Sequence, residues 1–231
     1  MAAIIGAMAL LTLVRHGQAS FGADDYDRLS ALGERQCRLL GEHWCAQGRR
    51  FDAVLTGTLK RHAQALAAIN GGMGGALPAP QLHPGLDEYD SEALIRALRP
   101  DRPLARPTNA EEVKDWFRQL REALRAWSAA AITPVGMKTF AEFSAGVADA
   151  LDQVRRSGRR EVLIVSSGGP ISTATAQVLA APFDSAIELN LRMRNSAVTE
   201  FSFTPKRHVL HTFNQLPHLQ GADAAGLETY A

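Results

Sequence analysis

The chain is short of several features that would mark a specialised class of protein. Only two of its 231 residues are cysteines, which excludes a small scaffold held together by disulfides. Aromatic residues make up 6%, and 25 basic residues nearly cancel 24 acidic ones, which leaves a formal net charge of +1. Such a balance gives no electrostatic reason to expect nucleic acid as the main partner. No apolar run reaches the roughly 20 residues that span a bilayer, so we expect no membrane partner either.

The apolar stretch near the start has only part of the signature of a signal peptide. Residues 4–14 are mostly apolar, but no Lys or Arg precedes them and no small-residue cleavage site ends the run. We interpret residues 10–14 as a buried strand and the preceding ones as a start-site extension or a frayed end, and we expect a cytoplasmic location. Cys37 and Cys45 lie eight positions apart in a helical pattern, too far along the axis to bridge easily. We interpret both as buried free thiols.

The composition of the chain is that of an ordinary globular protein. Hydrophobic residues make up 46% and charged residues 21%. A chain of 25.0 kDa buries roughly 70% of its surface on folding, which is enough for one substantial core. We therefore expect residues 1–231 to form a single domain.

Apolar runs and helical patterns alternate along the chain. Strands are predicted at 10–14, 51–55, 161–166, 197–203 and 208–213, with a weaker candidate at 81–86. Helices are predicted at 30–46, from about 60 to 69, at 110–130, at 139–157 and after Ser167, where Pro170 falls in the first turn. Alternation of this kind predicts an α/β fold with a mostly parallel sheet. The block at about 99–138 breaks the alternation with three prolines and one long helix, and we expect it to form a small helical cap insertion.

Polar residues suited to bind phosphate follow three of the predicted strands. Arg15 and His16 come after the first strand, and Arg61 falls in the helix turn after the second. Ser167 and the backbone amide of Gly168 open the helix after the strand at 161–166. Ligands of such sheets bind at the carboxyl ends of the strands, helix N-termini attract anions, and the guanidinium fork matches phosphate oxygens. The sequence therefore predicts a phosphate pocket at this edge.

Ordered segments along nearly the whole chain resemble those of the histidine phosphatase superfamily, which is also called phosphoglycerate mutase-like. The Arg-His-Gly signature lies within Leu13–Gly17, and a Gly-x-x-Gln helix pattern within Leu29–Gln36. The further matches are the strand and the Arg-containing helix turn at 51–61 (pattern S-x-L-x-R-A), the acidic segment at 86–88, the strand and turn at 162–169 (v-l-v-V-s-H-G-g) and the start of a late strand at 195–198. The resemblance implies a three-layer α/β/α sandwich.

The resemblance also implies a role for each matching residue. His16 would be the nucleophile that accepts the phosphoryl group as phosphohistidine, and Arg15 and Arg61 would hold the phosphoryl oxygens. Glu88 would protonate the leaving oxygen and then activate water. No metal and no cofactor is implied. The long aromatic stretch of the cofactor-dependent mutases is missing after His16, so the pattern favours hydrolysis of a small phosphorylated substrate.

Two departures from the family pattern weaken the expected pocket. The family places a second histidine where this chain has Ser167, and a neutral hydroxyl gives a bond roughly half as strong as a protonated imidazole. The family often has Ser or Thr three residues after the nucleophile and Asn three further on, where this chain has Ala19 and Gly22. Ser20, one position off, is the remaining candidate for a phosphate contact in that loop.

Several alternatives stay open at this point. A weakly active or inactive phospho-ligand-binding protein on the same fold is the second function hypothesis, because the second family histidine is Ser167. Asp87 or Asp90 could replace Glu88 as the acid. His62 follows Arg61, and because a helix turns about 100° per residue, we expect its side chain to point elsewhere. A homodimer through an exposed sheet edge is a further option.

Overall fold

The computed structural model describes residues 8–20, 27–101, 104–105, 107–220 and 226–230. The strands are β1 (Ala9–Arg15), β2 (Ala53–Thr56), β3 (Pro80–Leu82), β4 (Glu161–Ser166), β5 (Val198–Phe203) and β6 (His208–Gln215). The helices are α1 (Ala31–Ala46), α2 (Lys60–Gly72), α3 (Ser91–Leu98), α4 (Ala110–Ser128), α5 (Phe140–Arg156), α6 (Gly168–Val178) and α7 (Phe183–Asn190), with a 3₁₀ turn at Pro84–Leu86.

The strands form one six-stranded sheet in the order β3-β2-β4-β1-β5-β6. The four strands from β3 to β1 are parallel, β5 pairs antiparallel with β1, and β6 pairs antiparallel with β5. The carboxyl ends of β2, β4 and β1 therefore meet at one edge. The predicted α/β fold with a mostly parallel sheet is confirmed.

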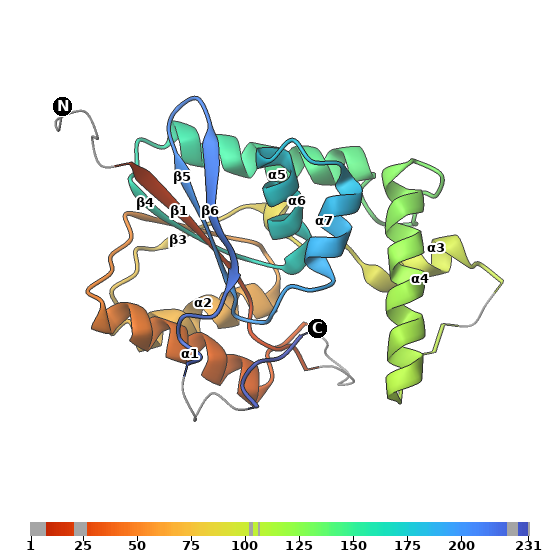
Figure 1. The fold of residues 1–231 in the computed structure, drawn as a ribbon, viewed down its shortest axis with the longest axis horizontal. Helices are drawn as coiled ribbons and strands as arrows, with labels where there is room; N and C mark the ends of the chain where they lie inside the picture. The colour runs from red at the N-terminus through yellow and green to blue at the C-terminus, as the bar shows by residue number, and fades with distance from the viewer. Residues whose placement is uncertain (1–7, 21–26, 102–103, 106, 221–225, 231) are drawn as a thin grey trace.

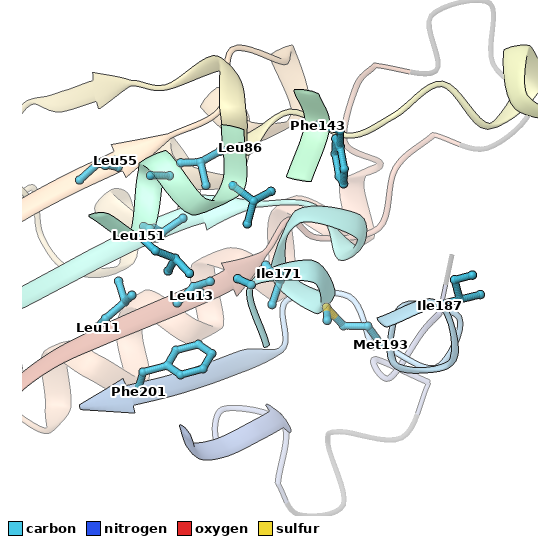
Figure 2. Packing of buried hydrophobic residues seen from close by; sticks show 14 of the residues in the cluster. Leu11, Leu13, Leu55, Leu86, Phe143, Leu151, Ile171, Ile187, Met193 and Phe201 are labelled. Atoms are coloured by element: carbon cyan, nitrogen blue, oxygen red, sulfur yellow. The ribbon is translucent and has the colours of Figure 1, made fainter. Parts of the chain in front are cut away.

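Helices cover both faces of the sheet (Figure 1), with α1 and α2 on one side and α5 and α6 on the other. Successive side chains of a strand point to opposite faces. Val14, Leu163 and Val165 accordingly pack in one core cluster with residues of α1 and α2. Leu11 and Leu13 join the other cluster, where Leu151 of α5 and Ile171 of α6 lie over the strands (Figure 2). The three-layer sandwich that the resemblance implies is thus present.

Polar side chains cap several of the helices at their N-termini. Ser30 accepts a hydrogen bond from the Gly33 amide and starts α1, as the sequence predicts. The Asn109 side chain accepts bonds from two amides and starts α4, and Thr139 and Glu142 form a capping box at α5. The long helix of the predicted cap lies beside α7 and away from the sheet (Figure 1). Residues 102, 103 and 106 of that block lie outside the described residues.

Some local predictions are wrong. The candidate strand at 81–86 is a three-residue strand, β3, followed by the 3₁₀ turn, because Pro84 has no amide to donate to a neighbouring strand. Two eight-residue helices, α3 and α7, were not predicted. Cys37 is buried, but Cys45 is exposed because it lies near the end of α1. The start-site extension at 1–7 lies outside the described residues. Over the described part of the chain, we find no helix that is long and apolar enough to cross a membrane.

Candidate active site

His16 lies immediately after β1, at the sheet edge where the parallel strands end. Its backbone is held from two sides, since its amide donates to the Ser166 carbonyl oxygen at 2.9 Å and its carbonyl oxygen accepts from the Ser196 amide at 3.1 Å. The ring nitrogen Nδ1 lies 2.7 Å from the Gly17 carbonyl oxygen. A carbonyl oxygen can only accept, so Nδ1 carries the proton and donates it. The lone pair of the neutral ring is therefore on Nε2.

The surroundings of His16 keep its ring neutral. Burial lowers the pKa of His16 well below its ordinary value, and the positive charges of Arg61 and Arg15 lower it further. The Gly17 carbonyl oxygen raises this pKa by a smaller amount. A neutral imidazole with a free Nε2 lone pair is a competent nucleophile near pH 7.

Gly17 is required by the packing of the loop against α1. A Cβ atom on Gly17 would lie 2.1 Å from the Gly33 carbonyl oxygen, and one on Gly33 would lie 2.1 Å from the Gln18 carbonyl oxygen. Both glycines therefore allow backbone to approach backbone, which fixes the loop that carries His16. These are the glycines of the two motifs that opened the resemblance.

The two arginines come from different elements and lie close to His16. Arg61 is in the first turn of α2, is 8% exposed and donates to Asp27 Oδ1 at 2.9 Å. The other oxygen of Asp27 accepts from the Lys60 amide at 2.9 Å, so this carboxylate both caps α2 and orients Arg61. Arg15 is 7% exposed and donates to the Met193 carbonyl oxygen. Both guanidinium charges act on His16 and on Glu88, so both arginines lie near these two side chains.

Glu88 reaches the turn between β4 and α6. Its Oε2 accepts from the Gly169 amide at 3.0 Å, and its Oε1 accepts from the Tyr89 amide at 3.2 Å. Burial raises the pKa of Glu88, although the Gly169 amide and the two arginines oppose the shift. A carboxyl group with a raised pKa retains its proton to a higher pH, as a general acid requires.

The two alternative acids are bonded to other groups. Asp90 is exposed and caps α3, where its Oδ1 accepts from the amides of Glu92 and Ala93 at 2.9 and 3.0 Å. Asp87 accepts from the backbone amide and the hydroxyl of Thr58. Of the three acidic residues, Glu88 is the one for which a bond to the β4–α6 turn is found.

Gly168 and Ser20 are also among the residues predicted for the pocket. The Gly168 Cα faces the Asn190 side chain, because a Cβ atom there would lie 2.1 Å from Asn190 Oδ1. The Ser20 amide donates to the Arg28 carbonyl oxygen at 2.8 Å, and no contact of its hydroxyl with the other site residues is found among the described ones. Gly22, where the family often has Asn, lies outside the described residues.

The prediction for His62 is wrong. Its side chain is fully buried at the sheet edge, and its Nε2 lies 2.7 Å from the Ser167 hydroxyl. The ring centroids of His62 and His16 are 5.9 Å apart. The 100° rotation does separate His62 from Arg61, but it turns the imidazole toward Ser167 at the end of β4 rather than away from the site. Asp27 was also missed, since a carboxylate in a loop gives no sequence signal for the helix that it caps.

Comparison with known proteins agrees with this fold. The family model of the histidine phosphatase superfamily (branch 1) matches residues 11–216. Phosphoserine phosphatase from Entamoeba histolytica, solved with 3-phosphoglyceric acid, superposes with a TM-score of 0.62 at 21% identity and covers 92% of this chain and 100% of its own. The α-ribazole phosphatase from Shigella flexneri gives 0.62 at 20% identity, covering 90% of this chain and 96% of its own.

A third similar structure is a mycobacterial glucosyl-3-phosphoglycerate phosphatase with inorganic phosphate. Its TM-score is 0.64 at 19% identity, and it covers 92% of this chain and 100% of its own. No curated protein sequence matches this chain significantly. Since the family model spans most of the chain, including the loop of His16 and the turn of Ser167, this protein belongs to the histidine phosphatase superfamily, branch 1.

Proposed function

We propose that this protein is a phosphomonoesterase that hydrolyses a small phosphorylated substrate through a phosphohistidine on His16. The observation that carries the proposal is the state of His16, whose Nδ1 proton is committed to Gly17 and whose pKa is lowered by burial and the two arginines. The similar solved structures are named as phosphatases of small phosphorylated molecules, which supports the same class of substrate.

The first chemical step is transfer of the phosphoryl group to His16. The Nε2 lone pair attacks phosphorus, the bond from phosphorus to the ester oxygen breaks, and the leaving oxygen takes the proton of Glu88. The ring gains positive charge as the new bond forms, and the Gly17 carbonyl oxygen that accepts from Nδ1 stabilises it. Arg15 and Arg61 offset the negative charge on the transferring oxygens.

The second step returns the enzyme to its starting state. A water oxygen attacks phosphorus, the ionised Glu88 takes a proton from that water, and the bond from phosphorus to Nε2 breaks. Inorganic phosphate leaves, and both His16 and Glu88 recover their first protonation states. The same carboxyl group thus acts as acid and then as base, which a raised but accessible pKa permits.

We propose that the cap predicted at about 99–138 holds the acid in place. Trp127 of α4 packs edge-on against Tyr89, the residue after Glu88, with ring centroids 5.8 Å apart. Phe143 of α5 contacts both rings, at 5.8 and 5.3 Å. A packed aromatic cluster resists displacement, so the segment that carries Glu88 is anchored to the cap.

A second candidate function is binding of a phosphorylated ligand without turnover. One observation favours it: the Ser167 hydroxyl is within hydrogen-bond distance of His62 and the Gly169 amide donates to Glu88, so both groups have partners within the protein. The arginines alone would then hold the phosphate.

Hydrolysis of p-nitrophenyl phosphate separates the two functions. We expect turnover in the wild type and a loss of about 10⁴-fold or more in His16→Ala, because the nucleophile is removed. Rapid quenching in base with a ³²P-labelled substrate should trap an acid-labile, base-stable phosphoenzyme in the wild type only. Phosphate binding without turnover, with unchanged affinity in His16→Ala, would favour the binding protein. Turnover that persists in His16→Ala would refute the mechanism.

A further inference from the structure

His62 is a buried histidine at the centre of the site that the steps above do not use. It comes from the first turn of α2, and its ring lies tilted by 38° to that of His16. Ser167 is its hydrogen-bond partner, at 2.7 Å from Nε2 to Oγ, and both side chains are completely buried. His62 therefore contacts the residue that stands where the family has its second histidine.

The turn before α2 leaves room for this ring. A Cβ atom on Gly57 would lie 2.3 Å from His62 Nδ1 and 2.5 Å from Asp87 Oδ1. Any other residue at Gly57 would therefore displace the imidazole or the carboxylate. The position of the ring is fixed by the neighbouring backbone as well as by its bond to Ser167.

Asp87 faces the other side of the ring. Its Oδ1 lies 3.8 Å from His62 Nδ1, which is too long for a hydrogen bond. No hydrogen-bond partner of Nδ1 is found in the described part of the chain. The ring is thus held between a carboxylate on one side and the Ser167 hydroxyl on the other.

Ser167 lies beside the nucleophile. Arg15 of β1 is paired with Ser166 of β4, and the His16 amide donates to the Ser166 carbonyl oxygen, so the next residues of the two strands are neighbours. A phosphoryl oxygen can only accept, so a hydroxyl that serves it must direct its one proton there. The Ser167 oxygen is then left to accept from His62, which has its Nε2 at the right distance to donate.

We propose that His62 is a positioning residue that orients the Ser167 hydroxyl toward the phosphoryl group on His16, so that His62 and Ser167 together replace the second family histidine. The proposal rests on the phosphatase function proposed above. It explains the two exchanges as one change, because the family pattern has Ala where this chain has His62 and His where it has Ser167.

The same geometry does not allow a histidine at position 167 together with His62. An imidazole at position 167 would have to occupy the space that already holds the His62 ring, 2.7 Å from the Ser167 hydroxyl in a region with no exposed surface. Overpacking of this kind destabilises a well-packed interior. Ser167→His should therefore function only when His62 is made small.

A set of variants tests the pair by kcat and KM on p-nitrophenyl phosphate and by affinity for orthovanadate, which mimics the transferring phosphoryl group. We expect Ser167→Ala and His62→Ala each to lower kcat by about 10- to 100-fold while KM changes less than about threefold, because the donor acts in the transition state. The double variant H62A/S167A should lose no more than either single one, because the two residues act as a unit.

Two further variants keep the test independent of folding defects. His62→Gln retains an N–H that can donate to Ser167 and should recover most of the activity that His62→Ala loses. H62A/S167H should be at least about tenfold more active than His62→Ala and more active than Ser167→His. His211→Ala is the matched control. His211 also pairs with a serine, since its Nε2 lies 2.8 Å from the Ser202 hydroxyl, but this pair lies outside the site. The substitution should change neither kcat nor the affinity for orthovanadate.

Additive losses in the double variant, or full activity in His62→Ala, would overturn the pairing and leave His62 a packing residue. These outcomes differ from failure of the proposed function, which would appear as wild-type turnover that is absent or insensitive to His16→Ala. In that case the same comparison of variants is made on orthovanadate affinity, where losses in both single variants without a further loss in the double would still support the pair. A wild type that binds no orthovanadate would refute both proposals.

Discussion

The two sides of the candidate active site are built in different ways. At the end of β1, the loop of His16 is fixed by backbone, since Gly17 packs on the Gly33 carbonyl and the His16 peptide groups bond to Ser166 and Ser196. At the end of β4, the turn of Ser167, Gly168 and Gly169 is contacted by side chains from other segments. These are His62 of α2, Asn190 of α7 and Glu88 from the loop before α3.

This difference indicates which positions of the site can be substituted and which cannot. A side chain that fills space beside a turn can be exchanged if its partner changes with it, as we infer for His62 and Ser167. At Gly17 no such compensation is available, because a Cβ atom would lie 2.1 Å from a backbone carbonyl oxygen, which is present whatever residue occupies position 33. We therefore expect the β1 side to tolerate no substitution at its glycine and the β4 side to tolerate coupled ones.

The largest effect that probes the β4 side should come from Glu88→Gln, which keeps the size of the side chain but removes the acid. We expect kcat to fall about 10²- to 10⁴-fold on an alkyl phosphate, whose leaving oxygen needs a proton, and less on p-nitrophenyl phosphate. The comparison of the two substrates is the measurement.

Asp90→Asn is the matched control for this prediction. Asparagine caps a helix about as well as aspartate, so α3 should stay intact and both rates should be unchanged. A similar loss on both substrates in Glu88→Gln would show that protonation of the leaving oxygen is not the main role of Glu88.

Arg61→Ala should have the next largest effect. Its guanidinium is oriented by Asp27, and loss of one preorganised donor for the transferring oxygens typically costs about 10²- to 10³-fold in rate. Arg61→Lys should recover little, because an ammonium group cannot span two phosphate oxygens. Steady-state kinetics of the three proteins decide this, and near wild-type rates in Arg61→Ala would leave phosphate binding to Arg15 alone.

The β1 side of the site could be predicted from the sequence more fully than the β4 side. The β1 side is encoded in consecutive residues, so Arg15, His16 and Gly17 could be placed from the strand that precedes them and the motif that they form. Glu88 and Arg61 could be placed because each lies in a matching segment. The partner of Ser167 is 105 positions away in the chain, and its direction depends on how α2 leaves the sheet. The exchange of Ala for His62 in the family pattern was the one available signal.

Thermodynamic stability should reveal the contrast between the two sides directly. Gly17→Ala places a methyl group against a backbone carbonyl, and we expect it to lower the free energy of unfolding by about 3 kcal/mol or more. Gly168→Ala meets the end of the Asn190 side chain, which can rotate, and gains helix propensity in α6, so we expect a loss of about 1 kcal/mol or less. Urea denaturation of both variants measures the difference, and equal losses would contradict the contrast.

The smallest effect concerns the titration of His62 on the β4 side. Burial, and then the charge of Arg61, lowers the pKa of His62 to about 3 in the folded protein, against about 6.5 in the unfolded chain. The unfolded state therefore binds the extra proton between these values, and stability that is complete above pH 6.5 is lost as the pH falls toward 3. Each such histidine contributes about 1.4 kcal/mol per pH unit within that window, or about 2 kcal/mol between pH 7 and pH 5.

Removing that titration with His62→Gln isolates its contribution. Glu88 has the opposite sign, because its raised pKa means that stability is lost as the pH rises through it, but this term is common to both proteins and cancels in their difference. We expect the free energy of unfolding of His62→Gln to fall by about 2 kcal/mol less than that of the wild type between pH 7 and pH 5. Parallel pH dependences would mean that folding does not lower the pKa of His62, so that the folded protein takes up the same proton in this range and the β4 side then carries a charge that its burial argues against.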